Sequence, residues 1–143
     1  MIVNSHIQTP AAKFDARALM EAHGHIRTYL ALLAAETARS VPDMAAVSAI
    51  RVKLTQASRR RTEILDELLA ACLRSDPASL EVAAMQAELR RARLTSSGHI
   101  STWTSRTIAA DWKGYCAASA RLRDAVKRQI VAEAQLVERI ARA

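Results

Sequence analysis

The sequence predicts a single all-α domain, folded as an up-down-up-down antiparallel four-helix bundle. Half of its 143 residues are hydrophobic, only three are glycine and three are proline, and alanine, leucine and arginine are abundant. These three residue types favour helix, and strand-forming residues nowhere gather into alternating apolar and polar runs. A chain of this length normally forms one domain, so we assign residues 1–143 to one helical-bundle domain.

Three interruptions divide the chain into four predicted helices, over about residues 11–39, 43–74, 77–105 and 110–141. Two interruptions contain a proline, Pro42 or Pro77, and the residue before a proline avoids the helical conformation. We expect Asp76 to cap the third helix, with Pro77 at its first position. The third interruption is a cluster of threonine and serine before residue 111. Because the connections are short, consecutive helices should lie antiparallel.

Apolar residues recur every three or four positions and define the core-facing side of each predicted helix. The faces of the last three helices include Leu54, Ala57, Ala92, Ser96, Leu122 and Val126. Four polar side chains interrupt the faces: His23, Arg61, Gln129 and Glu133. Burying an unpaired polar group is costly, so these side chains either reach outward to solvent or meet inside the bundle. An isolated histidine is more often a satisfied core or rim residue than a ligand, but antiparallel pairing favours a meeting of the four.

At these positions the sequence resembles the hemerythrin-like (HHE cation-binding) family of four-helix bundles. His23 resembles the histidine of the family's first helix, and Arg61 with Leu65 stands at the ligand pair of the second helix. Gln129 and Glu133 stand at the ligand pair of the fourth helix, and the resemblance covers about residues 19–140. It implies two helical hairpins around a metal centre.

The family's metal ligands are largely replaced in this chain. A di-iron site in a bundle needs about five to seven histidine and carboxylate ligands from all four helices. Only His23 and Glu133 keep such residues at matching positions, and the third helix has no histidine before His99, near its end. Three positions carry other side chains: Arg61, Leu65 and Gln129. Two ligands do not hold iron against water, so the sequence predicts no bound metal and no cofactor.

An ion pair is the predicted replacement for the metal. Arginine is permanently charged and presents a planar fork that suits a carboxylate. If Arg61 and Glu133 lie at the same depth, the guanidinium stands where metal charge would balance carboxylates, and Gln129 and His23 complete the hydrogen bonding. Such a pair specifies the register of the helices more than it adds net stability.

The sequence contains no recognisable catalytic or phosphate-binding motif. Its three glycines, at positions 24, 98 and 114, are too scattered for a phosphate loop. Neither Cys72 nor Cys116 has a histidine at helical spacing, and both lie in apolar patterns where reduced thiols are expected. These features predict a non-enzymatic protein.

Charge and hydropathy limit the expected location of the protein and the kinds of partner it can bind. The formal charge of +7 comes mostly from arginine and allows weak, nonspecific binding of polyanions. With few aromatic residues and no helix-turn-helix signature, specific nucleic-acid binding is not expected. The first residues show no signal peptide, and no apolar stretch reaches the ~20 residues of a membrane span. We therefore expect a cytoplasmic protein with no membrane partner.

The function predicted from these features is that of a binding or regulatory module. Its partner would be another protein, a second copy of the chain or a small apolar ligand. The alternative is a residual metal-binding or oxygen-sensing hemerythrin-like protein that uses His23, Glu133 and further carboxylates. The metal content of the purified protein distinguishes the two.

Overall fold

The computed structural model describes the backbone of residues 10–142 and the side chains of residues 16–142. Helices occupy almost all of this range: α1 (Pro10–Thr37), α2 (Met44–Ser75), α3 (Leu80–Thr102), α4 (Ser105–Ala110) and α5 (Trp112–Arg142). No strand occurs between residues 10 and 142, which confirms the predicted all-helical class. None of the helices in this range is both long and apolar enough to cross a membrane.

The start of α3 corrects the prediction. Asp76, the predicted cap of this helix, instead ends α2, where its amide donates a hydrogen bond to the carbonyl of Cys72 at 2.9 Å. Ser79 caps α3, and its hydroxyl accepts a hydrogen bond from the amide of Val82 at 3.3 Å. Aspartate and serine are both favoured at helix caps, and the amide of Ser79 donates to the carbonyl of Asp76 at 3.1 Å. Pro77 therefore lies in a turn and not in the first turn of α3.

The short helix α4 is a second difference from the four predicted helices. Thr104 has an extended backbone, and its hydroxyl accepts a hydrogen bond from the amide of Thr107 at 3.3 Å. In return, the amide of Thr104 donates to the hydroxyl of Thr107 at 2.8 Å. This reciprocal capping box starts a new helix, so the chain between α3 and α5 is itself helical. Ile108 of α4 is fully buried and closes this end of the core.

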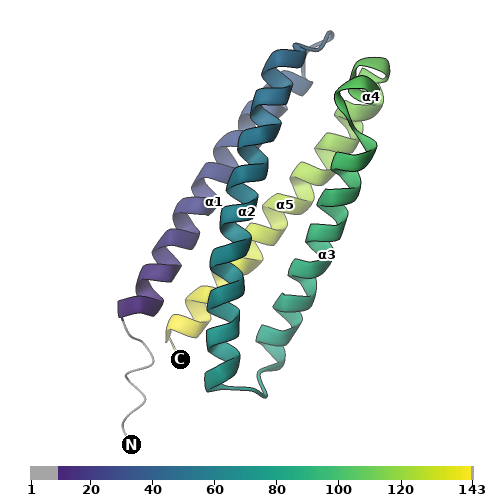
Figure 1. The fold of residues 1–143 in the computed structure, drawn as a ribbon. Coiled ribbons are helices and arrows are strands. Elements are labelled where there is room, and N and C mark those ends of the chain that lie inside the picture. The colour runs from purple at the N-terminus through teal and green to yellow at the C-terminus, as the bar shows by residue number, and fades with distance from the viewer. Residues whose placement is uncertain (1–9, 143) are drawn as a thin grey trace, which may run out of the picture.

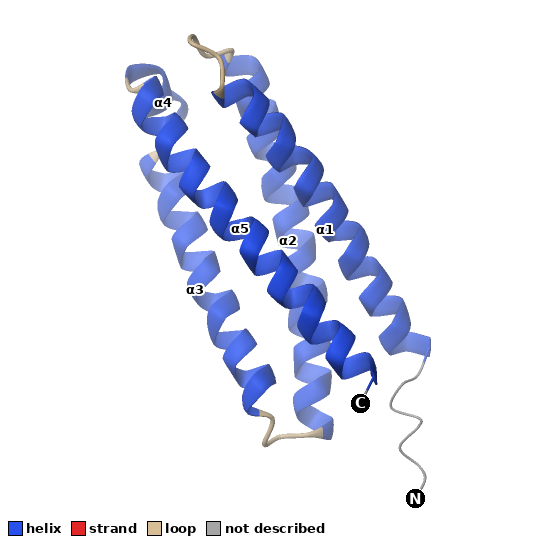
Figure 2. Cartoon of the chain, turned by 180° about the vertical axis from the view of Figure 1, so that it is seen from behind, coloured by secondary structure: helices blue, strands red, loops and turns tan. Residues whose placement is uncertain are grey.

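The four long helices lie side by side and alternate in direction (Figure 1). α1 and α3 run toward the end that carries α4, and α2 and α5 run back from it. α1 and α2 pack closely along their length, and α5 packs against α1. α3 is attached less extensively, through its contacts with α2 and α5 (Figure 2).

The core is continuous along α1 but thin beside α3. The predicted face of α1 is buried throughout: Leu19, His23, Ile26, Leu30 and Leu33. In the middle of α2, α3 and α5, by contrast, several residues predicted for the core are only half-buried: Leu54, Ala57, Ala92, Ser96, Leu122 and Val126. All of them except Ala57 line a groove between α2, α3 and α5, so the interior is incompletely filled at this level.

Candidate functional site

Glu133 of α5 lies at the centre of a buried polar network, and its side chain has no exposed surface. The Arg61 guanidinium of α2 donates through Nη2 to Oε2 at 2.8 Å and through Nε to Oε1 at 2.9 Å. Arg61 is itself only 6% exposed. Two parallel N–H groups on one carboxylate form the strongest arrangement available to an arginine–carboxylate pair.

Two further side chains complete the network around Glu133. His23 of α1 is buried, with Nε2 2.9 Å from Oε1 of the carboxylate. Gln129, one turn earlier on α5, donates from Nε2 to Oε2 at 3.0 Å, and the same nitrogen lies 3.4 Å from Sδ of Met85 on α3. A charged carboxylate only accepts hydrogen bonds, so His23 carries a proton on Nε2. All four long helices thus contribute a side chain at this level.

The network holds Glu133 in its charged form. Burial by itself raises the pKa of this carboxyl, but the hydrogen bonds from His23, Arg61 and Gln129 and the positive charge of Arg61 more than offset burial. The pKa of Glu133 is therefore lowered from its ordinary value. The opposite charges of Arg61 and Glu133 compensate one another inside the protein.

The predicted ion pair between Arg61 and Glu133 is confirmed, and His23 and Gln129 join it as expected. The alternative, in which these side chains reach outward to solvent, is wrong for Arg61, His23 and Glu133, because all three are buried. Gln129 is half-buried. Leu65, one turn after Arg61, is fully buried in an apolar cluster of the core.

The residues of the network do not fit a di-iron centre. Glu133 supplies its only carboxylate, and each carboxylate oxygen already accepts at least two N–H groups. Arg61 adds a permanent positive charge that repels a cation. His99 lies elsewhere, with its ring centroid 5.9 Å from that of Tyr115. Between residues 16 and 142 no group of three or more His, Cys, Asp or Glu side chains is arranged to hold a metal ion.

Beside the network, a groove of about 890 Å³ lies between α2, α3 and α5. Leu54, Leu122 and Val126 form part of its apolar wall, and serine and threonine side chains are interspersed among them. Arg61 and Gln129 also line it, so the network and the groove share a wall. The apolar pattern alone does not predict this groove, because it identifies the faces of the helices and not the distances between them.

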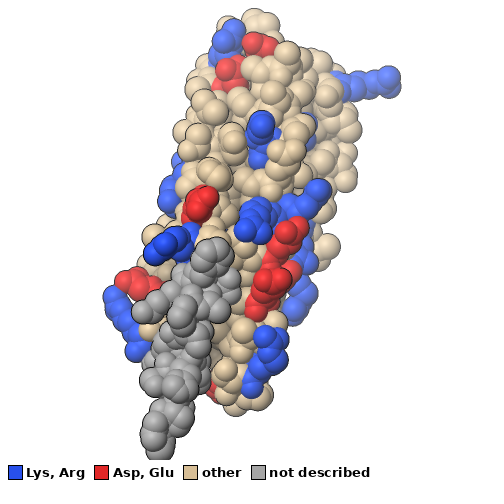
Figure 3. All heavy atoms as spheres, turned by 60° about the vertical axis from the view of Figure 1, so that its left-hand side comes forward, with Lys and Arg blue, Asp and Glu red and all other residues tan. Residues whose placement is uncertain are grey.

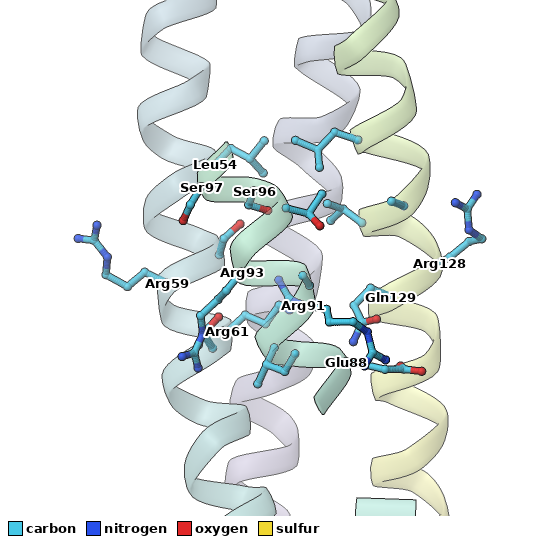
Figure 4. Close-up of a pocket in the computed structure, with 18 of the residues that line it drawn as sticks. Leu54, Arg59, Arg61, Glu88, Arg91, Arg93, Ser96, Ser97, Arg128 and Gln129 are labelled. Carbon is cyan, nitrogen blue, oxygen red and sulfur yellow. The ribbon is translucent and has the colours of Figure 1, made fainter. Parts of the chain in front are cut away.

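The groove is basic. One acidic residue, Glu88, lines it. Five arginines also line it: Arg59, Arg61, Arg91, Arg93 and Arg128. Arg61 is paired with Glu133, and Arg93 is paired with Asp66 at 2.6 Å. Among the described residues the other three arginines have no ion-pair partner. Arg59 and Arg128 project to the two sides, whereas Arg61 and Arg91 lie between them (Figure 4).

Charges of both signs are mixed on other parts of the surface. On the face shown in Figure 3, basic and acidic side chains are interspersed, and much of the surface carries neither. Some of the charges are paired across helices, as where Nε of Arg139 on α5 donates to Oε1 of Glu81 on α3 at 2.7 Å. The face in Figure 3 therefore offers no continuous basic surface to a nucleic acid.

Comparison of the chain with protein-family models, curated proteins and solved structures finds no match. The resemblance to hemerythrin-like bundles at His23, Arg61, Leu65, Gln129 and Glu133 therefore has no support from these comparisons. The function has to be inferred from the chemistry of the network and of the groove.

Proposed function

We propose that this protein is a non-enzymatic binding module that holds a small ligand in the groove between α2, α3 and α5. The observation that carries the proposal is the groove itself, whose volume is about 890 Å³. Small-molecule sites in proteins typically have about 300–1,000 Å³. Because α3 forms one wall and is the least firmly attached long helix, occupancy of the groove would alter its packing. Such a coupling between ligand binding and the packing of α3 would suit a regulatory module of the cytoplasm.

We assign the scaffold to the up-down-up-down antiparallel four-helix bundles, of the hemerythrin-like kind. The alternating directions of α1, α2, α3 and α5 support the bundle assignment. The convergence of His23, Arg61 and the Gln129–Glu133 pair supports the family assignment, because these positions resemble the family's ligand positions. In this protein an ion-pair network takes the place of the metal centre.

The chemistry of the interior favours binding over catalysis. Glu133 is a poor general base near neutral pH, since its pKa is lowered and its oxygens are engaged in hydrogen bonds. Burial raises the pKa of the Cys72 and Cys116 thiols, which disfavours the nucleophilic thiolate. Glu133, Cys72 and Cys116 also do not line the groove, and we expect no enzymatic activity.

A neutral, environment-sensitive dye, Nile red, tests whether the groove binds ligands. Wild-type protein should bind one dye molecule per chain with enhanced fluorescence, because apolar side chains line the groove. Ala92→Trp places an indole in the groove and should abolish this binding, and Val126→Trp should do the same from α5. Ala83→Trp is the matched control, since Ala83 is an exposed residue of α3 that does not line the groove.

Circular dichroism establishes that each variant is folded before its dye binding is compared. If the folded Ala92→Trp and Val126→Trp variants bound Nile red as wild type does, the proposed function would be refuted. Metal analysis tests the alternative of a residual metal-binding or oxygen-sensing protein. Stoichiometric iron that disappears in His23→Ala and Glu133→Gln variants would favour that alternative.

A further inference from the structure

We infer that the ligand of this groove is an aliphatic carboxylate of medium chain length. The inference rests on the proposed binding function and names the chemical class of the ligand. The aliphatic tail lies along Leu54, Leu122 and Val126, and the carboxylate lies beside Arg61 and Arg91.

The arginines of the groove lie toward one end of its apolar wall. In Figure 4 Leu54, with Ser96 and Ser97 beside it, lies in the upper part of the view, and Arg61 lies in the lower part. The same division recurs along α5, where Leu122 and Val126 precede Gln129 by about two turns and one turn. A ligand with one apolar end and one polar end matches this arrangement.

Arg61 has an edge that the ion pair leaves unused. Its Nε and Nη2 bind Glu133, whereas Nη1 makes no hydrogen bond with any described residue. Arg61 lines the groove and keeps a small exposed fraction, 6%. A guanidinium has only N–H donors. The end of the ligand that accepts hydrogen bonds therefore belongs beside Arg61.

Arg91 supplies the positive charge that a carboxylate requires. It lies near the middle of the view in Figure 4 and has no ion-pair partner among the described residues, Glu88 included. Arg93 is engaged in an ion pair, and Arg59 and Arg128 project to the sides. Arg91 is an exposed residue, and it is the central arginine of the groove without an ion pair, which matches a ligand with a single negative charge.

A series of ligands tests both ends of this description. Octanoate, decanoate and dodecanoate, each below its micelle concentration, should displace Nile red with a Kd that falls about fourfold for each methylene. Decanol keeps the tail but lacks the charge, and it should bind at least about tenfold more weakly than decanoate, because hydrogen bonds to charged groups are stronger. Decylamine should not displace the dye, since the arginines repel its charge.

Two neighbouring arginines of α3 provide a matched pair of variants. Arg91→Gln should raise the Kd for decanoate about tenfold and leave the Kd for decanol unchanged. Arg90→Gln should change neither, because Arg90 is exposed like Arg91 but does not line the groove. In wild-type protein, the Nη resonances of Arg61 should shift more when decanoate is added than when decanol is added, because the carboxylate is charged.

The possible results separate this inference from the proposed function. If decanol displaced Nile red as well as decanoate, or if Arg91→Gln left the decanoate Kd unchanged, the carboxylate assignment would be wrong while the groove remained a binding site. If Nile red did not bind the groove at all, the proposed function would fail as well. If dye binding were lost under conditions in which light scattering reports a dimer, a second copy of the chain would occupy the groove. That result would overturn both the proposed function and the carboxylate assignment.

Discussion

Arg61 Nη2 and Glu133 Oε2 lie 2.8 Å apart, although 72 residues separate them in the chain. The contact joins α2 to α5 within the interior, between clusters of buried apolar residues. A buried ion pair of this kind adds little net stability relative to well-packed apolar residues, but removal of one partner leaves the other charge uncompensated. The pair therefore fixes the depth at which α2 and α5 are aligned.

Removal of the Glu133 carboxylate should destabilise the fold strongly. Glu133→Ala leaves the guanidinium of Arg61 buried without its counter-charge, and we expect a loss of roughly 3–5 kcal/mol in the free energy of unfolding. Urea denaturation followed by circular dichroism measures this loss. Asp66→Ala is the control, because its ion pair with Arg93 is about half exposed, and it should cost no more than about 1 kcal/mol. Similar losses in the two variants would contradict the prediction.

Replacement of both partners should restore much of the stability. In Arg61→Met with Glu133→Leu, neither charge is left buried alone, and the apolar side chains occupy a similar volume. We expect the double variant to be at least about 2 kcal/mol more stable than Glu133→Ala, again by urea denaturation. A double variant as unstable as Glu133→Ala would show that packing, and not the stranded charge, dominates the cost.

The stability should fall in acid because of Glu133. Its pKa in the folded protein is lowered, so the unfolded chain binds more protons than the folded protein as the pH falls. The stabilising contribution of Glu133 is fully present above its unfolded pKa, about 4.3, and is lost as the pH falls through the lower folded pKa. Glu133→Gln should have a shallower decline of unfolding free energy below about pH 5. Equal declines in wild type and variant would exclude this role.

The ion pair could be predicted from the sequence because its residues interrupt regular apolar faces. Arg61 and Glu133 lie at mid-helix positions, carry opposite charges and would be costly to bury separately. The helix breaks at Pro42 and Pro77 could also be predicted from the sequence, because proline restricts the conformation of the residue before it. Asp76 and Ser79, however, are both suitable caps three residues apart, and local preference does not decide between them.

The groove could not be predicted in this way. Its existence depends on how far α3 stands from α2 and α5, and small side chains such as Ala92 and Ser96 are compatible with either a closed or an open arrangement. The apolar pattern of Leu122 and Val126 is also the same for a core and for a ligand site. Only the arrangement in space reveals that these side chains share a wall with Arg61.

Polyanion binding should be weak, independent of sequence and strongly dependent on salt. The formal charge of +7 attracts phosphates. Three arginines stand in succession at residues 59–61, but Arg61 is buried and paired, so only Arg59 and Arg60 are available to a polyanion. The slope of log affinity against log salt should be about −0.9 for each phosphate contacted, and duplexes of unrelated sequence should bind equally in a fluorescence anisotropy titration. Arg59→Gln with Arg60→Gln should reduce this slope without creating a sequence preference, because the remaining contacts are also to phosphate. A duplex whose affinity exceeded that of its scrambled counterpart at raised salt would contradict this prediction, since screening removes phosphate attraction and leaves base recognition.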